Sequence, residues 1–547
     1  MKEHSILIGG SAGDGSKKAG LIIAKLLSSY GYQIYIHEDY QSVIRGGHNF
    51  SLIRASNEKV LTHRDEIDLL IAFNEDTIKR HTKRLKDKDM VIYNSDAFEF
   101  DRGNGFPIET IAKNIGGLLI MKNTALVGAF AKTVGIDWNT LKKVLISELK
   151  VATDKNLLVA KEAYKTAQAK MKIPKLSSYK RPLISGNSAI VLGSLKAGLD
   201  SYFAYPMTPA TSILNCMAQK GVKYGVKVFQ PENEIAVANA AIGAAFAGSR
   251  VMIGTSGGGF ALMNEALSFA AQAEIPLVVV NVSRSGPSTG LPTYGGQSDL
   301  FHVLSAGHGD FDRFVVAPGD PEEAFYLTQL TMDIAWRYQI PSIILSDKDL
   351  AECTYSFDLD SLEKYTPGKL SLWDRKGEYK RFKITKDGVS PIAFPGEKGA
   401  VVKATSYEHD EFGIAIEDEK TTKLMQDKRS RKFRSLEKEI SKIKAVKVYG
   451  NKKSKTAIIA WGSVKGAAIE FAKEKNIKMI QPLIMSPFPE KQIKRALLGV
   501  SRIITVETNN RGQLAQLLRY YGIESKSVLK YTGRLFTTKE LISKIKI

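Results

Sequence analysis

The stretch Tyr202–Leu214, YFAYPMTPATSIL, joins a short apolar run to a turn that contains two prolines. Proline fixes its own φ, lacks an N–H, and pushes the residue before it out of the α region. The run YFAYP therefore predicts a strand that ends in a rigid turn. Because such a turn holds Thr208 in a fixed position, we expect this residue to belong to a functional site.

Similar apolar runs follow along the chain. They predict strands at RVMIGTS, LVVVNVS, FVVAP and PSIILSD, with helices at Glu234–Gly248, Phe260–Ala273 and Pro321–Tyr338 between them. The same alternation fills residues 1–115, from the strand SILIGG onward, and returns at KTAIIAWGS. Strands that alternate with helices indicate an α/β fold with mostly parallel sheets and helices on both faces.

A chain of 547 residues is too long for one ordinary hydrophobic core. The regular alternation of strands and helices weakens after the second α/β segment and resumes near residue 450, where the third α/β segment begins. We expect four segments, at residues 1–175, 176–355, 356–450 and 451–547.

The composition limits the classes of function. The net charge is +21, but lysines are spread along the whole chain and are densest in residues 420–455. That segment is either a solvated helix face and hinge or a surface that attracts an acidic protein or an anionic cofactor. No nucleic-acid-binding module is recognisable. No apolar run reaches the ~20 residues of a membrane helix, and the start, MKEHSILIGG, resembles no targeting signal, so we expect a cytoplasmic protein.

The chain has two cysteines, Cys216 and Cys353. A disulfide scaffold is excluded, and so is an iron–sulfur cluster held by this chain alone, which needs about four thiolates. Without an HExxH or paired CxxC motif, no metal site is expected. The segment His409–Glu411 contains ligand-type side chains, but a structural loop is the favoured interpretation.

A glycine-rich turn, GGSAGDGSKKAG, follows the first strand and is a possible anion cradle. It contains Gly13-Asp14-Gly15, the start of a Mg²⁺-diphosphate motif. The next asparagine, Asn49, lies too far along the chain to complete that motif. The spacing also fits a dinucleotide fingerprint poorly, which leaves a nucleotide-dependent dehydrogenase as a weak third hypothesis.

Two further stretches contain polar side chains suited to chemistry. In Pro231–Gly248, Glu234 begins a helix of small residues, where a carboxylate lies near the positive end of the helix dipole. In Val278–Leu300, a buried strand leads to Arg284 and a loop with Ser288, Thr289 and Thr293. These groups are able to bind a carboxylate, which arginine contacts with two donors. A tightly packed core helix and an ordinary surface loop are the structural alternatives.

Together these motifs resemble the α subunit of 2-oxoacid:ferredoxin oxidoreductases, in the form that has a γ domain fused ahead of it. The resemblance covers almost the whole chain. It rests on motifs in the expected order: SVIRGGHNFSLIRAS, YPMTP, PENEIAVANAAIGA, TSGGGFALM, SRSGPSTGLPT, DGVSPIAFPG, EHDEFG, WGSVKGA and ETNNRGQLAQLLR.

The resemblance implies a multidomain α/β protein with a Rossmann-like γ domain, a thiamine-diphosphate pyrimidine-type domain and a transketolase-C-like domain. The implied reaction is decarboxylation of a 2-oxoacid with coenzyme A to acyl-CoA, CO₂ and reduced ferredoxin. A β subunit is expected to complete the thiamine diphosphate site and to hold Mg²⁺ and a [4Fe-4S] cluster. The alternative from another class is a non-catalytic scaffold subunit that docks redox partners.

The resemblance also implies roles for individual residues. Glu234 is expected to contact N1′ of the aminopyrimidine, with Glu232 as the less favoured alternative. Thr208 is expected beside the cofactor and the substrate, and Arg284 on the substrate carboxylate. Further substrate-binding residues are expected at Thr293, Tyr205, Ser288 and Thr289, and further cofactor-binding residues at Pro206, Ser256 and Gly257.

Two assignments stay open, and one motif departs from the usual pattern. Arg45 and His48 are expected either to help hold the CoA phosphates or to form a docking turn of the γ domain. Tyr294 stands where relatives often have a charged residue, so 2-oxoglutarate, pyruvate and branched 2-oxoacids all remain candidate substrates. The triple glycine Gly257–Gly259 replaces a more usual Gly-Pro-Gly and should loosen its turn.

Overall fold

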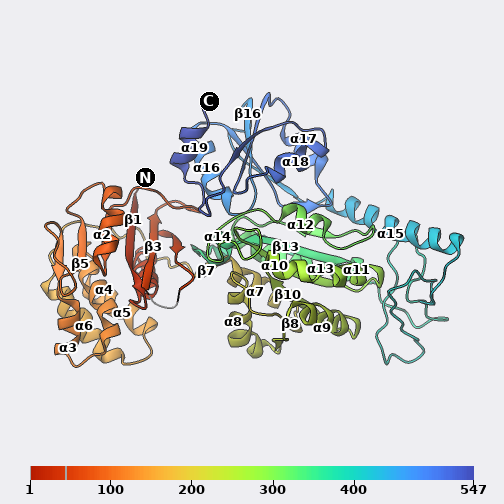
Figure 1. Cartoon of the computed structure of the whole chain (residues 1–547), viewed down its shortest axis with the longest axis horizontal. Helices are drawn as coiled ribbons and strands as arrows, with labels where there is room; N and C mark the ends of the chain where they lie inside the picture. The colour runs from red at the N-terminus through yellow and green to blue at the C-terminus, as the bar shows by residue number, and fades with distance from the viewer. Residues whose placement is uncertain (1, 44–45) are drawn as a thin grey trace. The chain divides into compact units, whose positions relative to one another are not determined.

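The computed structural model describes residues 2–43 and 46–547 (Figure 1). The chain forms two compact units. The first comprises Met1–Ile184, Cys353–Asp360 and Thr537–Glu540, and the second comprises Ser185–Glu352, Ser361–Phe536 and Leu541–Ile547. The α/β class that the sequence predicts is confirmed.

The first unit contains an eight-stranded sheet in the order β6-β5-β4-β1-β3-β2-β14-β7. Its strands are β1 (Glu3–Ala12), β2 (Gln33–Asp39), β3 (Gly46–Ser56), β4 (Leu69–Ala72), β5 (Val91–Asn94), β6 (Asn104–Phe106), β7 (Leu183–Ser185) and β14 (Thr354–Ser356). β1, β4, β5 and β6 are parallel, whereas β3 is antiparallel to β1 and β2, and β14 is antiparallel to β2. The prediction of a mostly parallel sheet is therefore wrong for half of this unit. The connection from β2 to β3 is too short for a crossover helix, so these strands form an antiparallel pair.

Helices pack against this sheet and bury a common core. They are α1 (Ser16–Ser29), α2 (Glu75–His81), α3 (Ile108–Asn114), α4 (Lys122–Thr133), α5 (Trp138–Glu148) and α6 (Thr153–Thr166). In α1 the buried residues Ala19, Ile22, Ile23, Leu26 and Leu27 follow helical spacing and enter the core.

The glycine-rich turn after β1 is occupied by its own acid. Asp14 Oδ2 accepts a hydrogen bond from the Ser11 N–H at 2.7 Å, and Asp14 Oδ1 lies 2.9 Å from Lys122 Nζ. A carboxylate in this position repels a phosphate group. The turn therefore gives no support to the anion cradle or to the dinucleotide hypothesis.

The second unit contains a seven-stranded sheet in the order β18-β12-β13-β11-β10-β8-β9. The strands are β8 (Ser201–Phe203), β9 (Lys227–Phe229), β10 (Val251–Thr255), β11 (Leu277–Ser283), β12 (Phe314–Val316), β13 (Pro341–Asp347) and β18 (Ile484–Ser486). All the pairings are parallel except that between β12 and β18. The five strands predicted in this segment are confirmed.

Helices of the same segment are α7 (Gly186–Lys196), α8 (Thr211–Lys220), α9 (Glu234–Phe246), α10 (Gly257–Leu262), α11 (Asn264–Gln272), α12 (Leu300–Ser305), α13 (Pro321–Tyr338) and α14 (Lys348–Glu352). The helix predicted at Phe260–Ala273 is divided, because Met263 leaves the helical conformation between α10 and α11. Helix α10 also begins earlier than predicted, within the triple glycine.

A five-stranded sheet, β15-β17-β16-β19-β20, follows in the same unit. Its strands are β15 (Val446–Gly450), β16 (Thr456–Ile459), β17 (Lys478–Pro482), β19 (Arg502–Glu507) and β20 (Lys526–Leu529). The helices of this part are α16 (Lys465–Glu474), α17 (Glu490–Ala496) and α18 (Gln513–Tyr520). Helix α19 (Thr538–Lys544) begins in the first unit and ends in the second. One hydrophobic cluster contains Val279 and Ile343 of the seven-stranded sheet together with Ile459 and Ile480 of this one. The two sheets of the second unit therefore share a core.

Residues 362–418, all of them described, form no helix or strand, and α15 (Glu419–Ile440) follows them. Two lysines of this basic helix are internal. Lys428 and Lys432 are buried, and both bind the carboxylate of Glu274. This part of the basic segment is therefore neither a solvated face nor a steering surface. No helix among the described residues combines the length and apolar character needed to cross a lipid bilayer.

Candidate functional site

The turn after β8 contains Thr208 and is fixed from two sides. Asn187, near the start of α7, donates its Nδ2 to the Pro209 carbonyl at 2.9 Å and to Ser212 Oγ at 2.8 Å. The Thr208 carbonyl accepts a hydrogen bond from Arg284 Nη1 at 2.6 Å. Thr208 is half-buried, whereas Tyr205 and Pro206 are exposed. The structure thus brings Thr208 and Arg284 together.

Glu234 is the first residue of α9, and Asn233 caps this helix by accepting the Ala236 N–H at 2.9 Å. The Glu234 side chain is buried, with 4% of the residue exposed. Its Oε1 has no hydrogen-bond partner among the described residues. A buried carboxylate oxygen without a partner is costly, so this oxygen is a candidate for contact with a ligand. Glu232, the alternative, is exposed.

The glycine-rich start of α10 lies against Glu234. A Cβ on Gly259 would overlap both Glu234 Oε1 and Thr255 Oγ1. The hydroxyl of Thr255 points to Met207 Sδ at 3.7 Å, which links this group to the Thr208 turn. Only a glycine lets the Glu234 carboxylate and the Thr255 hydroxyl pack this close to the backbone of α10.

Ser256 is the residue before the triple glycine, and Gly257 is its first residue. Ser256 is fully buried, and its Oγ has no partner among the described residues. Gly257 is partly exposed, and a Cβ there would lie 2.9 Å from Asp299 Oδ2. Asp299 accepts a hydrogen bond from Asn281 Nδ2 at 3.1 Å, and burial raises the pKa of the Asp299 carboxyl group.

Arg284 follows the last residue of β11 and is half-buried. Burial lowers the pKa of its guanidinium, and Asp299 opposes this shift. In the loop that follows, Thr293 is buried, whereas Ser288 and Thr289 are exposed. The loop therefore places one of its three candidate hydroxyl residues in the interior, and the other two at the surface.

Sequence reasoning missed several side chains that build this site. Asn187, Thr255 and Asp299 gave no signal of their own, although Thr255 directly precedes the SGGG turn. Met207 lies inside the YPMTP motif but had no assigned role. The contacts that reveal these residues join segments far apart in the chain.

In the first unit, Arg45 lies outside the described residues. His48 is buried, and its Nε2 lies 2.8 Å from Nε2 of His81. Burial lowers the pKa of His48, and it lowers the pKa of His81 to about 3. A CoA-binding role for Arg45 and His48 stays a prediction.

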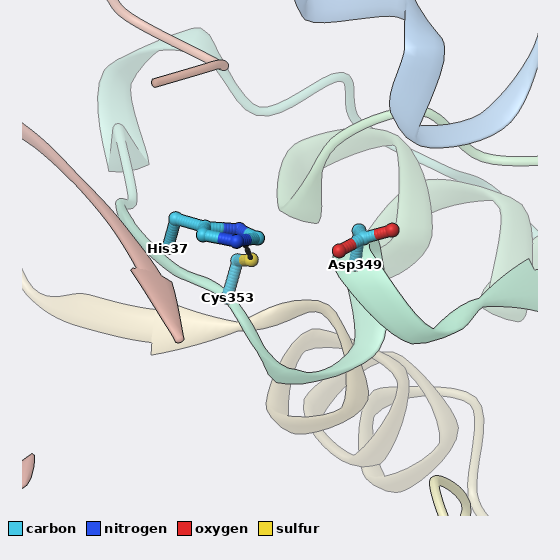
Figure 2. A group of neighbouring side chains, drawn as sticks. All are labelled: His37, Asp349 and Cys353. Atoms are coloured by element: carbon cyan, nitrogen blue, oxygen red, sulfur yellow. Dashed lines mark hydrogen bonds between the residues drawn. The ribbon is translucent and has the colours of Figure 1, made fainter. Parts of the chain in front are cut away.

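The chain re-enters the first unit at Cys353. This cysteine is buried, and it lies beside His37, as Figure 2 shows. Its Sγ lies 3.8 Å from His37 Nδ1 and accepts a hydrogen bond from the Tyr35 hydroxyl at 3.4 Å. Asp349, the third residue labelled in Figure 2, belongs to the second unit, and burial raises the pKa of its carboxyl group to about 7.

The EHDEFG loop is built from internal contacts. The ring of His409 packs on Phe382 with centroids 3.8 Å apart, and Asp410 Oδ1 accepts the Phe412 and Ile414 N–H groups at 2.9 Å. Glu411 accepts the Ile384 N–H at 2.9 Å. These contacts explain the loop as a structural element.

Comparison with known proteins identifies relatives along nearly the whole chain. A family described as pyruvate flavodoxin/ferredoxin oxidoreductase, thiamine diphosphate-binding, matches residues 192–429, and the pyruvate ferredoxin/flavodoxin oxidoreductase family matches residues 5–166. The α subunit of a 2-oxoacid:ferredoxin oxidoreductase from a Sulfolobus species is 32% identical over 98% of this chain and 95% of its own length.

A solved structure shows the same fold. The 2-oxoglutarate:ferredoxin oxidoreductase from Magnetococcus marinus, with 2-oxoglutarate, coenzyme A and succinyl-CoA bound, superposes with a TM-score of 0.90 and 31% identity. The match covers 100% of this chain and 99% of that one. The 2-oxoglutarate synthase subunit KorA from Archaeoglobus fulgidus is 39% identical over 36% of this chain and 55% of its own. The chain described here therefore belongs to the family of 2-oxoacid:ferredoxin oxidoreductase α subunits.

Proposed function

We propose that this chain is the catalytic α subunit, fused to its γ domain, of a CoA-acylating 2-oxoacid:ferredoxin oxidoreductase. With a β subunit it decarboxylates a 2-oxoacid and yields acyl-CoA, CO₂ and reduced ferredoxin. The preferred substrate class includes 2-oxoglutarate, which the Magnetococcus relative binds together with coenzyme A. The observation that carries the proposal is the buried, unpartnered Oε1 of Glu234.

The residues of the site fit the aminopyrimidine of thiamine diphosphate. A ring nitrogen that carries a proton would satisfy Glu234 Oε1, and the close packing of Glu234 on Gly259 would hold the carboxylate in place. When bound, thiamine diphosphate supplies the nucleophilic carbon that attacks the 2-oxo group and the electron sink for loss of CO₂. Glu234 would hold and exchange the proton at N1′, within the hydrogen-bonding distance that general acid–base catalysis requires.

The remaining site residues would orient the 2-oxoacid. Arg284 would pair with the carboxylate that all 2-oxoacids share, because a guanidinium contacts both carboxylate oxygens. Its hydrogen bond to the Thr208 carbonyl holds the guanidinium beside the proline-framed turn. The Thr208 hydroxyl would donate to the 2-oxo oxygen or bind the cofactor amine, and Thr293 would support the same subsite.

The [4Fe-4S] cluster would belong to the β subunit, because the chain has two cysteines in total. Mg²⁺ would belong there as well, because Gly13-Asp14-Gly15 is not followed by an asparagine at the spacing of a Mg²⁺-diphosphate motif. The functional segments would follow the boundaries given above, with the γ domain at 1–175 and the pyrimidine-type domain at 176–355. The connecting segment would be 356–450 and the transketolase-C-like domain 451–547. The enzyme would act in the cytoplasm.

The test is to purify the chain with its β subunit and to measure CoA-dependent reduction of a viologen dye with a panel of 2-oxoacids. Turnover that requires thiamine diphosphate, CoA and at least one 2-oxoacid is expected. A complex that assembles with its cofactors but reduces no dye with any 2-oxoacid would favour the scaffold alternative.

A further inference from the structure

The loop that follows Arg284 closes on itself through Ser285. The Ser285 N–H donates to the Tyr294 carbonyl at 3.1 Å, Ser285 Oγ donates to the Gly295 carbonyl at 3.2 Å, and the Ser285 carbonyl accepts the Leu291 N–H at 2.9 Å. Because Ser285 is the neighbour of Arg284, a displacement of residues 291–295 would also displace Arg284.

The outer side of this loop is held by the segment after β20. The Gly295 N–H donates to the Gly533 carbonyl at 3.1 Å. The guanidinium carbon of Arg534 lies 3.7 Å from the centre of the Tyr294 ring, which is the geometry of a cation–π contact. A Cβ on Gly533 would lie 3.0 Å from Tyr294 Cβ, and the positive φ of Gly533 also favours glycine.

A second anchor lies at the end of the loop. Gln297 is fully buried, and its Nε2 donates to the Trp461 carbonyl at 2.8 Å. Its Oε1 accepts the Thr508 N–H at 3.1 Å, and Asn509 Nδ2 donates to its carbonyl at 3.1 Å. Gln297 is therefore fixed by buried hydrogen bonds. Tyr294 is held by two backbone hydrogen bonds, to Ser285 and Leu291, and its ring stacks on Arg534.

We propose that Arg534 is a positioning residue for substrate binding. By stacking on Tyr294 it fixes the loop, and through Ser285 it sets the position of the Arg284 guanidinium. The inference rests on the proposed function, because it assumes that Arg284 binds the carboxylate of the 2-oxoacid. It assigns the third α/β segment a part in substrate binding that no site residue discussed above provides.

The stacking of Arg534 on Tyr294 would position Arg284, and Arg284 would bind the carboxylate that all 2-oxoacids share. Loss of the stacking should therefore weaken the binding of mono- and dicarboxylic 2-oxoacids alike and leave CoA binding unchanged. A direct contact between Arg534 and the second carboxylate of a diacid would instead affect diacids only. The two roles are separable by comparing pyruvate with 2-oxoglutarate.

The experiment uses the complex with the β subunit and the variant Arg534→Met, which keeps an apolar chain but removes the cation. We expect the KM for pyruvate and for 2-oxoglutarate to rise about tenfold each, with kcat and the KM for CoA unchanged. Arg534→Lys should restore much of the binding. Arg502→Met, an exposed arginine on β19, is the matched control.

Hydrogen exchange gives a readout that does not depend on turnover. The Ser285 N–H donates a hydrogen bond to the Tyr294 carbonyl. The Ser285 amide should therefore exchange faster in Arg534→Met and return to its original rate in Arg534→Lys. An unchanged Ser285 exchange rate, or an unchanged KM in an active enzyme, would overturn the inference. So would a KM increase confined to 2-oxoglutarate. Failure of the unmodified complex to turn over any 2-oxoacid would contradict the proposed function, while the exchange measurement would still decide the inference.

Discussion

Glu234 and Glu274 are both buried glutamates of the second unit, but their surroundings are opposite. Both oxygens of Glu274 have cationic partners, since Oε1 binds Lys428 and Oε2 binds Lys432 at 2.5 Å. Arg381 donates to the backbone carbonyl of Glu274 at 2.6 Å. Glu234 Oε1 has no partner among the described residues.

The electrostatics of Glu274 show what a completed carboxylate site looks like. Burial alone would raise the pKa of Glu274, but the two lysines outweigh it and hold this pKa below its usual range. Burial lowers the pKa of Lys428 to about 8, against the attraction of Glu274. Glu274 is therefore paired within the fold, whereas Glu234 keeps one oxygen without a partner among the described residues, as the proposed cofactor contact requires.

The largest expected effect is on catalysis, and it tests Glu234, the buried acid with an oxygen that has no partner among the described residues. Glu234→Gln should lower kcat by about 10³-fold or more, in the range of general acid–base contributions, because the amide is unable to exchange the proton at N1′. The melting temperature should stay about the same, since the amide has the same shape as the carboxyl group. Dye reduction and a thermal melt measure the two quantities, with the exposed Glu232→Gln as control. Retained turnover in Glu234→Gln would contradict its catalytic role.

Substitution of Glu274, the acid paired with two lysines, should lower stability and leave substrate binding unchanged. Glu274→Gln leaves two buried lysines without their counter-ion and should lower the free energy of unfolding by about 3–5 kcal/mol. Denaturant unfolding measures this change, and KM values taken on the folded protein should not move. Asp427→Asn on α15, whose pair with Lys423 is exposed, should cost less than about 0.5 kcal/mol. Equal costs for the two variants would remove the distinction.

The space beside Glu234 is tested by two alanine substitutions. Gly259→Ala would push a methyl group into Glu234 Oε1 and Thr255 Oγ1, and a displacement of the acid should lower kcat about 10²-fold. Gly243→Ala, on the same helix as Glu234, meets nothing within 4 Å. This control should keep its activity and gain about 0.5–1 kcal/mol of stability from helix propensity. Full activity in Gly259→Ala would mean that the space is not used.

The smallest effect is the pH dependence of stability. The folded pKa of Glu274 is depressed, so its stabilisation is present above the unfolded pKa of about 4.3 and is lost as the pH falls below it. The contribution to the slope is at most about 1.4 kcal/mol per pH unit. Between pH 5 and pH 3, the free energy of unfolding should fall less steeply with decreasing pH for Glu274→Gln than for the unmodified protein. Parallel curves would show that Glu274 is not the titrating group.

The sequence was sufficient to place most strands and the candidate acid, because these signals are local. Apolar runs such as LVVVNVS correspond to β11, and the start of the alanine-rich segment coincides with the start of α9 at Glu234. Proline and glycine spacing also located the turn at Thr208. Burial then distinguished Glu234 from Glu232, which local pattern alone had left open.

Contacts between distant segments were beyond such reasoning. Nothing in the basic stretch 420–455 indicates that Lys428 and Lys432 enclose Glu274, about 150 residues earlier. The stacking of Arg534 on Tyr294 is equally invisible, because the two residues lie far apart in the sequence. The mixed direction of the first sheet was missed because β3 follows β2 after a short connection that carried no turn signature.

Strand β14 has a practical consequence for anyone who dissects this protein. It belongs to the first unit but is supplied by residues far downstream of Met1–Ile184, and it pairs with β2 through Thr354 and Tyr355, opposite Ile36 and Tyr35. A fragment cut at residue 184 would therefore leave β2 with an open hydrogen-bonding edge, which favours aggregation. A soluble fragment of this part would need a linker that restores Cys353–Asp360 to the edge.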